Sequence, residues 1–81
     1  MLIKILGPGC ANCVALERVT REALAGLGVE AEVVKVTDYP DIAAYGIMST
    51  PGLVVDEQVL LAGRVPTTAR VTELLAAHLA S

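Results

Sequence analysis

The sequence lacks tryptophan and phenylalanine, and its aromatic residues are Tyr39 and Tyr45 alone. The hydrophobic fraction of 54 % is therefore almost entirely aliphatic, so we expect a core of Leu, Val, Ile and Ala. Such a high apolar content argues against intrinsic disorder. A chain of 81 residues has room for one core of this kind, which predicts a single domain spanning residues 1–81.

Positive charge is also scarce, because six Lys and Arg residues face nine Asp and Glu residues and the net charge is −3. The basic residues are scattered, and no aromatic side chains lie between them to stack on bases. Nucleic-acid binding needs clustered Lys and Arg to contact phosphates. We therefore expect no nucleic-acid partner.

Long apolar runs are missing, since no stretch approaches the ~20 residues that cross a bilayer. The opening Met-Leu-Ile-Lys-Ile-Leu has no basic start, is interrupted by Lys4 and leads into Gly-Pro-Gly. These features indicate a strand and not a signal peptide. We expect a soluble, cytoplasmic protein with no membrane partner.

The spacing of apolar residues predicts an α/β protein with the element order βαβαββα. A parallel βαβ unit followed by a hairpin and a closing helix favours a four-stranded mixed sheet with helices on both faces. A short helix is expected to begin at Asp38 as its cap, and Thr67 or Thr68 to cap the last helix. The other elements are expected at strand 2–6, helix 11–27, strand 29–36, strand 53–56 and strand 59–62, with Asp56-Glu57-Gln58 joining the last two.

The only two cysteines, Cys10 and Cys13, lie where the first strand passes into the first helix. Residues three apart in a helical turn have Cβ atoms roughly 5–6 Å apart, so this pair can form and open a disulfide with little backbone movement. The helix N-terminus stabilises a thiolate at Cys10, which predicts the attacking thiol. Cys13 is one turn further in, on the apolar side, and is predicted to resolve the mixed disulfide.

Other uses of a Cys-x-x-Cys pair have to be weighed. A structural disulfide is uncommon in a reducing compartment. A closed zinc site wants four ligands, and the chain offers two cysteines and His78, so we expect no metal. Gly-Pro-Gly-Cys-Ala-Asn-Cys resembles the Cu(I)-binding loop of heavy-metal-associated copper chaperones, although Pro8 stands where that family commonly has Met. A soft-metal carrier and a redox-sensing module remain alternatives.

The second half of the chain resembles the thioredoxin superfamily. Thr50-Pro51 enters the third predicted strand, and Gly63-Arg64-Val65-Pro66 is similar to the minimal, glutaredoxin-sized proteins called redox-active disulfide protein 2. The resemblance implies a thiol–disulfide oxidoreductase without a bound cofactor. It implies that Thr50 and a cis Pro51 hold the backbone of a protein disulfide substrate, and that an upstream reductase restores the dithiol. Gly63 is expected either to permit close backbone approach beside the disulfide or simply to end the strand. We expect a monomer.

The sequence also departs from that family. Gly9 precedes the first cysteine and Ala11-Asn12 separates the pair, where thioredoxins have Trp and Gly-Pro. Lys4 stands at the position of the buried acid that helps to deprotonate the second thiol, and such a lysine more often reaches solvent along the strand. Met48, just before the Thr-Pro pair, is expected to fill a gap in the core, with a place in the lining of a substrate groove as the alternative.

Overall fold

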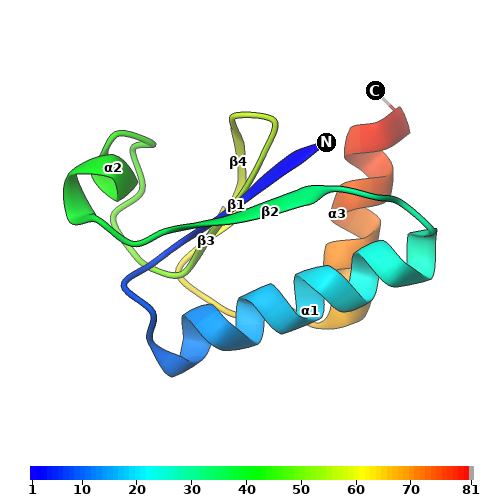
Figure 1. Cartoon of the computed structure of the whole chain (residues 1–81), viewed down its shortest axis with the longest axis horizontal. Coiled ribbons are helices and arrows are strands. Elements are labelled where there is room, and N and C mark those ends of the chain that lie inside the picture. Colours follow the sequence, from blue (N-terminus) through cyan, green and yellow to red (C-terminus); the bar gives the residue numbers. More distant parts are fainter. Residues whose placement is uncertain (81) are drawn as a thin grey trace.

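The computed structural model describes residues 1–80 and contains the predicted order of elements. Two helices lie together beside the sheet, and the short helix lies at one end of it (Figure 1). The elements are β1 (Leu2–Leu6), α1 (Ala11–Leu27), β2 (Glu32–Val36), α2 (Tyr39–Ala43), β3 (Gly52–Val55), β4 (Gln58–Ala62) and α3 (Thr68–Ala80).

The four strands form one mixed sheet in the order β2-β1-β3-β4. β1 pairs in parallel with β2, from Leu2 opposite Glu32 to Leu6 opposite Val36. β3 runs antiparallel to both β1 and β4. The α/β class and the mixed four-stranded sheet are therefore as predicted.

Alternation along β1 and β3 divides the core between the two faces of the sheet. Ile3 and Ile5 belong to the larger buried cluster, together with residues of α1 and α3. Leu6 and Val54 point the other way and pack with Ile42 of α2. Helices thus cover both faces, as expected from the sequence.

The second strand is shorter than predicted, because it begins at Glu32 and not at Val29. Gly28 ends α1 in the left-handed conformation, and the Val29 N–H bonds to the Leu24 carbonyl oxygen at 3.1 Å. This is the hydrogen bond of a Schellman helix end. β1 begins at Leu2, opposite Glu32, so the residues from Val29 to Ala31 have no partner in the sheet.

The hairpin between β3 and β4 turns at two residues, and Gln58, predicted as loop, begins β4. Asp56 and Glu57 both adopt positive φ (48° and 68°), although neither is Gly or Asn. Each carboxylate bonds across the sheet, Asp56 to the Leu2 N–H at 2.9 Å and Glu57 to Lys4 Nζ at 2.7 Å. These contacts explain a turn for which the sequence carries no Asn-Gly or Asp-Gly signal.

The helix caps differ from each other. Thr67 caps α3 as predicted, since its Oγ1 accepts a hydrogen bond from the Arg70 N–H at 3.1 Å. Asp38 occupies the cap position of α2, but its side chain makes no capping bond, so the predicted role is wrong. Among residues 1–80 there is no helix with the length and apolarity to cross a membrane.

We expect Leu75→Ala to lower the free energy of unfolding by about 2–5 kcal/mol, because Leu75 is a residue of α3 that is fully buried in the larger cluster. Leu79→Ala in the same helix is the matched control, since Leu79 is 48 % exposed. Urea unfolding followed by far-ultraviolet circular dichroism measures both. Equal losses in the two variants would contradict this packing of α3.

Candidate active site

The two cysteines lie in contact at the N-terminus of α1. Cys10 has extended backbone (φ −70°, ψ 170°) as the cap residue, and its carbonyl accepts from the Val14 N–H at 3.0 Å. Its side chain is exposed, whereas Cys13 is buried. Both thiols are unbridged, with the sulfur atoms 2.7 Å apart. One sulfur is therefore open to a reaction partner, and the other is shielded directly behind it.

The environment separates the acidities of the two thiols. The Cys13 side chain, followed by backbone N–H groups of the first helical turn, lowers the pKa of Cys10 through hydrogen bonds. Burial, followed by the hydrogen bond to Cys10, raises the pKa of Cys13. The exposed thiol is thus the one that ionises first. A nucleophilic thiol paired with a resolving thiol requires this order.

Gly7 allows this packing and was not singled out by the sequence reasoning. A Cβ at position 7 would overlap the Cys13 sulfur, and it would lie 3.8 Å from the Cβ of Thr50. The buried Gly7 backbone therefore fills the space between the second cysteine and the loop before β3. Its position three residues before Cys10 is the signal that could have identified it.

That loop carries the predicted Thr-Pro pair. The peptide bond between Thr50 and Pro51 is cis. Pro51 is buried, and its carbonyl accepts a hydrogen bond from the Gly63 N–H at 2.8 Å. A Cβ at Gly63, whose φ is +91°, would come within 3.2 Å of the Ser49 Cβ. Gly63 thus lies against the loop, on the side of β3 away from β1.

The remaining predicted residues surround the cysteines with small, uncharged groups. Gly9 adopts φ +90°, which favours glycine, immediately before Cys10. Ala11 and Asn12 are the first two residues of α1 and are exposed. Met48 is fully exposed next to the Thr50 loop, so the expected core role is wrong. The structure therefore offers an exposed thioether near the site instead of a core filler.

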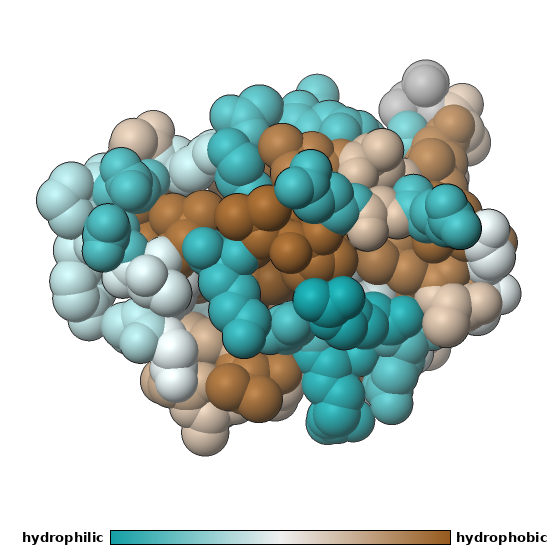
Figure 2. All heavy atoms as spheres, in the orientation of Figure 1, coloured by the Kyte–Doolittle hydropathy of each residue, from teal (hydrophilic) through white to brown (hydrophobic). Residues whose placement is uncertain are grey.

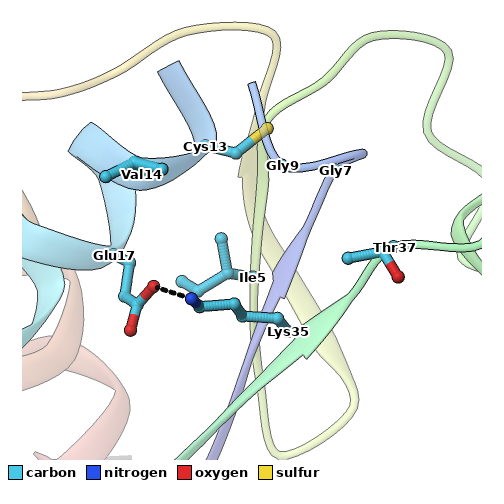
Figure 3. A pocket seen from close by; sticks show the side chains of 8 residues that line it. All are labelled: Ile5, Gly7, Gly9, Cys13, Val14, Glu17, Lys35 and Thr37. Atoms are coloured by element: carbon cyan, nitrogen blue, oxygen red, sulfur yellow. Dashed lines mark ion pairs between the residues drawn. The ribbon is translucent and has the colours of Figure 1, made fainter. Parts of the chain in front are cut away.

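A small pocket of about 130 Å³ reaches Cys13 from the side of β2 (Figure 3). Gly7, Ile5 and Val14 form part of its wall, and the far end is closed by the ion pair of Glu17 Oε1 with Lys35 Nζ at 3.0 Å. The Lys35 ammonium, helped by Arg21, holds the pKa of Glu17 below its usual range. The pocket lies on the β2 side of Cys13, across β1 from the Thr50 loop.

Lys4 takes no part in this site. It points to the α2 face of the sheet, opposite the face of Ile3 and Ile5, and its ammonium contacts Glu57 at 2.7 Å and the Tyr45 hydroxyl at 2.5 Å. These hydrogen bonds raise its pKa to about 12. Lys4 is therefore tied to the β3–β4 turn and does not reach freely into solvent. Within the described part of the chain, no three His, Cys, Asp or Glu side chains are arranged to hold a metal ion.

Gly7→Ala is expected to destabilise the fold by about 1–3 kcal/mol and to move the Cys13 sulfur, because the added methyl group overlaps it. Loss of the contact between the thiols should also raise the pKa of Cys10. Urea unfolding and the pH dependence of alkylation measure the two effects. Gly26→Ala is the control, since a Cβ there meets no atom within 4 Å. Unchanged Cys10 acidity in Gly7→Ala would be the contrary result.

Replacing Cys13, which donates a hydrogen bond to the Cys10 sulfur, should raise the pKa of Cys10 by an amount that depends on the substituent. Cys13→Ala removes the side-chain hydrogen bond that contributes most to the lowered pKa of Cys10, so the pKa rises toward its ordinary value. Cys13→Ser keeps a hydroxyl donor and should give an intermediate value. The pH at which iodoacetamide alkylation of Cys10 reaches half its maximal rate reports this pKa. An identical midpoint in all three proteins would show that the helix terminus alone sets the acidity.

Comparisons with known proteins agree with this geometry. Residues 1–76 match the family described as thioredoxin domain. A thioredoxin of Methanothermobacter thermautotrophicus is 40 % identical over 75 residues, which cover 93 % of this chain and 97 % of that protein. A thioredoxin of Methanocaldococcus jannaschii is 34 % identical, with coverages of 98 % and 91 %. The structure of thioredoxin 1 from Thermosipho africanus has a similar fold, with a TM-score of 0.61, 18 % identity and coverages of 99 % and 96 %.

Proposed function

The chain belongs to the thioredoxin family, and on this premise we propose that Cys10 attacks disulfides of protein substrates while Cys13 resolves the mixed disulfide. Family membership makes the chain a thiol–disulfide oxidoreductase. The observation that supports the attack order is the contact between an exposed thiol of lowered pKa and a buried thiol of raised pKa, with 2.7 Å between the sulfurs.

The reaction transfers two electrons in two exchange steps. The Cys10 thiolate attacks one sulfur of the substrate disulfide, so that a mixed disulfide forms and the other substrate sulfur leaves as a thiolate. Cys13 then loses its proton and attacks the Cys10 sulfur, which forms the Cys10–Cys13 disulfide and releases the second substrate thiolate. The substrate takes up two protons and is reduced, and the protein dithiol is oxidised.

The substrate backbone is proposed to lie along Thr50 and Pro51. Within residues 1–80, the backbone N–H and C=O of Thr50 have no hydrogen-bond partner, and the residue is half-buried beside Gly7. An extended segment could pair with these two groups, as in β-strand addition. Gly63 supports the loop from behind through Pro51. Gly9, Ala11 and Asn12 leave Cys10 sterically accessible.

The remaining expectations belong to the same proposal. The oxidised pair has to be reduced again, so an upstream reductase is a required partner. A dithiol that must be kept reduced suits a reducing compartment, which favours the cytoplasm. We further propose that residues 1–81 act as one domain and as a monomer.

Trapping with Cys13→Ser tests the attack order. Without the resolving thiol, the exposed Cys10 is expected to remain in mixed disulfides with protein substrates, whereas wild-type protein releases them reduced. Non-reducing electrophoresis with mass spectrometry identifies the adducts. Cys10→Ser is the matched control and should trap nothing, because Cys13 is buried.

The same purified proteins should differ in dithiothreitol-dependent reduction of insulin, which wild-type protein accelerates and both single variants do not. Adducts on Cys13 in Cys10→Ser at the level of those on Cys10 would refute the attack order. A wild-type protein without insulin reductase activity would refute the proposed substrate class.

A further inference from the structure

The segments around Cys10 carry almost no charge. Residues 5–16, which contain the cysteines, have no Asp, Glu, Lys or Arg, and the same is true of residues 42–55, which contain the Thr50 loop. Residues 58–63, which lead from β4 to the loop, are also uncharged. Arg64 is the first charged residue after them. Arg64 is therefore a charged residue that directly follows segments without charge. Figure 2 shows part of this neutral surface as hydrophobic and near-neutral atoms at the N-terminal end of α1.

The position of Arg64 is tied to the Thr50 loop. Gly63, its neighbour in the chain, donates its N–H to the Pro51 carbonyl at 2.8 Å and packs against Ser49. Arg64 therefore follows directly on the residue that holds the proposed substrate-binding loop. It also lines a groove of about 440 Å³ between β4 and α3, together with Arg70 and apolar residues that include Leu61 and Leu74.

Arg64 is exposed and is the basic side chain left without an ion pair in residues 1–80. Each of the others has a carboxylate partner; the pairs are Lys4–Glu57, Arg18–Glu22, Arg21–Glu17, Lys35–Glu17 and Arg70–Glu73. An unpaired guanidinium is available to a carboxylate of another molecule at no cost in internal contacts.

The opposite side of the cysteines has the opposite charge. Asp38 and Asp41 follow β2, and β2 and β4 are the two edges of the sheet, on either side of β1 and β3. The end of the sheet that carries the cysteines is therefore flanked by the exposed Asp38 after β2 and by Arg64 after β4, whereas Asp41 lines the hollow on the α2 face. This asymmetry favours one orientation of a substrate segment whose charge is uneven.

We propose that Arg64 is a specificity-determining residue that selects protein disulfides with acidic residues next to the attacked cysteine. The inference rests on the proposed function, because it takes the substrate backbone to lie along Thr50 and Pro51. It adds the substrate class: an extended segment whose carboxylate contacts the Arg64 guanidinium. Arg70 contributes less, because its guanidinium already contacts the Glu73 carboxylate at 3.3 Å.

Three synthetic peptides test this proposal, each with one disulfide and with either Asp, Asn or Lys flanking one cysteine. Reduced protein is mixed with each peptide, quenched with acid, and analysed by chromatography for the peptide dithiol. The measured quantity is the rate constant for the Asp or the Lys peptide divided by that for the Asn peptide, so that any general change in activity cancels.

Wild-type protein should reduce the Asp peptide about two- to fivefold faster than the Asn peptide at low salt, as expected for one exposed ion pair. It should reduce the Lys peptide more slowly than the Asn peptide. Arg64→Gln should bring the ratios close to one, and Arg64→Glu should reverse the order. Arg18→Gln is the control for net charge, because Arg18 lies on α1 beside Glu22 and outside the groove. It should keep the wild-type order.

The proposal would be overturned by wild-type ratios of one, or by a preference for Asp that persists in Arg64→Gln. A change in Arg18→Gln as large as that in Arg64→Gln would assign the preference to net charge and would overturn it as well. The Asn peptide separates this outcome from failure of the function itself. If wild-type protein does not reduce that peptide, the proposed oxidoreductase role fails, and the role of Arg64 fails with it.

Discussion

The close approach of the Gly7 backbone to the Cys13 sulfur is the constraint on which the site depends. It brings the end of β1, the first turn of α1 and the loop before β3 to one point, since the same Cβ position would also contact Thr50. Any side chain there would push the second cysteine away from the first. The contact between the two sulfurs at 2.7 Å, and with it the difference in their acidities, therefore follows from the absence of a side chain six residues earlier.

The order of strands explains why residues from distant parts of the sequence meet at this point. β1 is central, with β2 on one side and β3 on the other, so the segment after β1 and the segment before the antiparallel β3 lie at the same end of the sheet. β4 returns antiparallel to β3 and ends there too, which places Gly63 against Pro51. A short chain thus assembles three segments around one thiol without any long loop.

Apolar periodicity and the Cys-x-x-Cys position were sufficient to predict the element order, the mixed sheet and the two thiols, because these depend on local patterns. The strand start and the turn that the sequence did not predict correctly depend on tertiary contacts. The start of β2 at Glu32 is set by the start of its parallel partner β1 at Leu2, and the turn at Asp56 and Glu57 is stabilised by contacts with Leu2 and Lys4. Gly7 was missed for the same reason, since its position three residues before Cys10 is its one local signal and its contact with the Cys13 sulfur depends on how β1 and α1 pack.

Lys4 is neutralised by Glu57 on the face of the sheet opposite Ile3 and Ile5. The pKa of Cys10 is lowered mainly by its hydrogen bond with Cys13, with backbone N–H groups of the first helical turn adding to it. The leading causes of the lowered pKa are therefore hydrogen bonds and not charged side chains. Substitution of Arg64, which lies beside the neutral segments, is therefore expected to change the choice of substrate without altering the chemistry of the thiols.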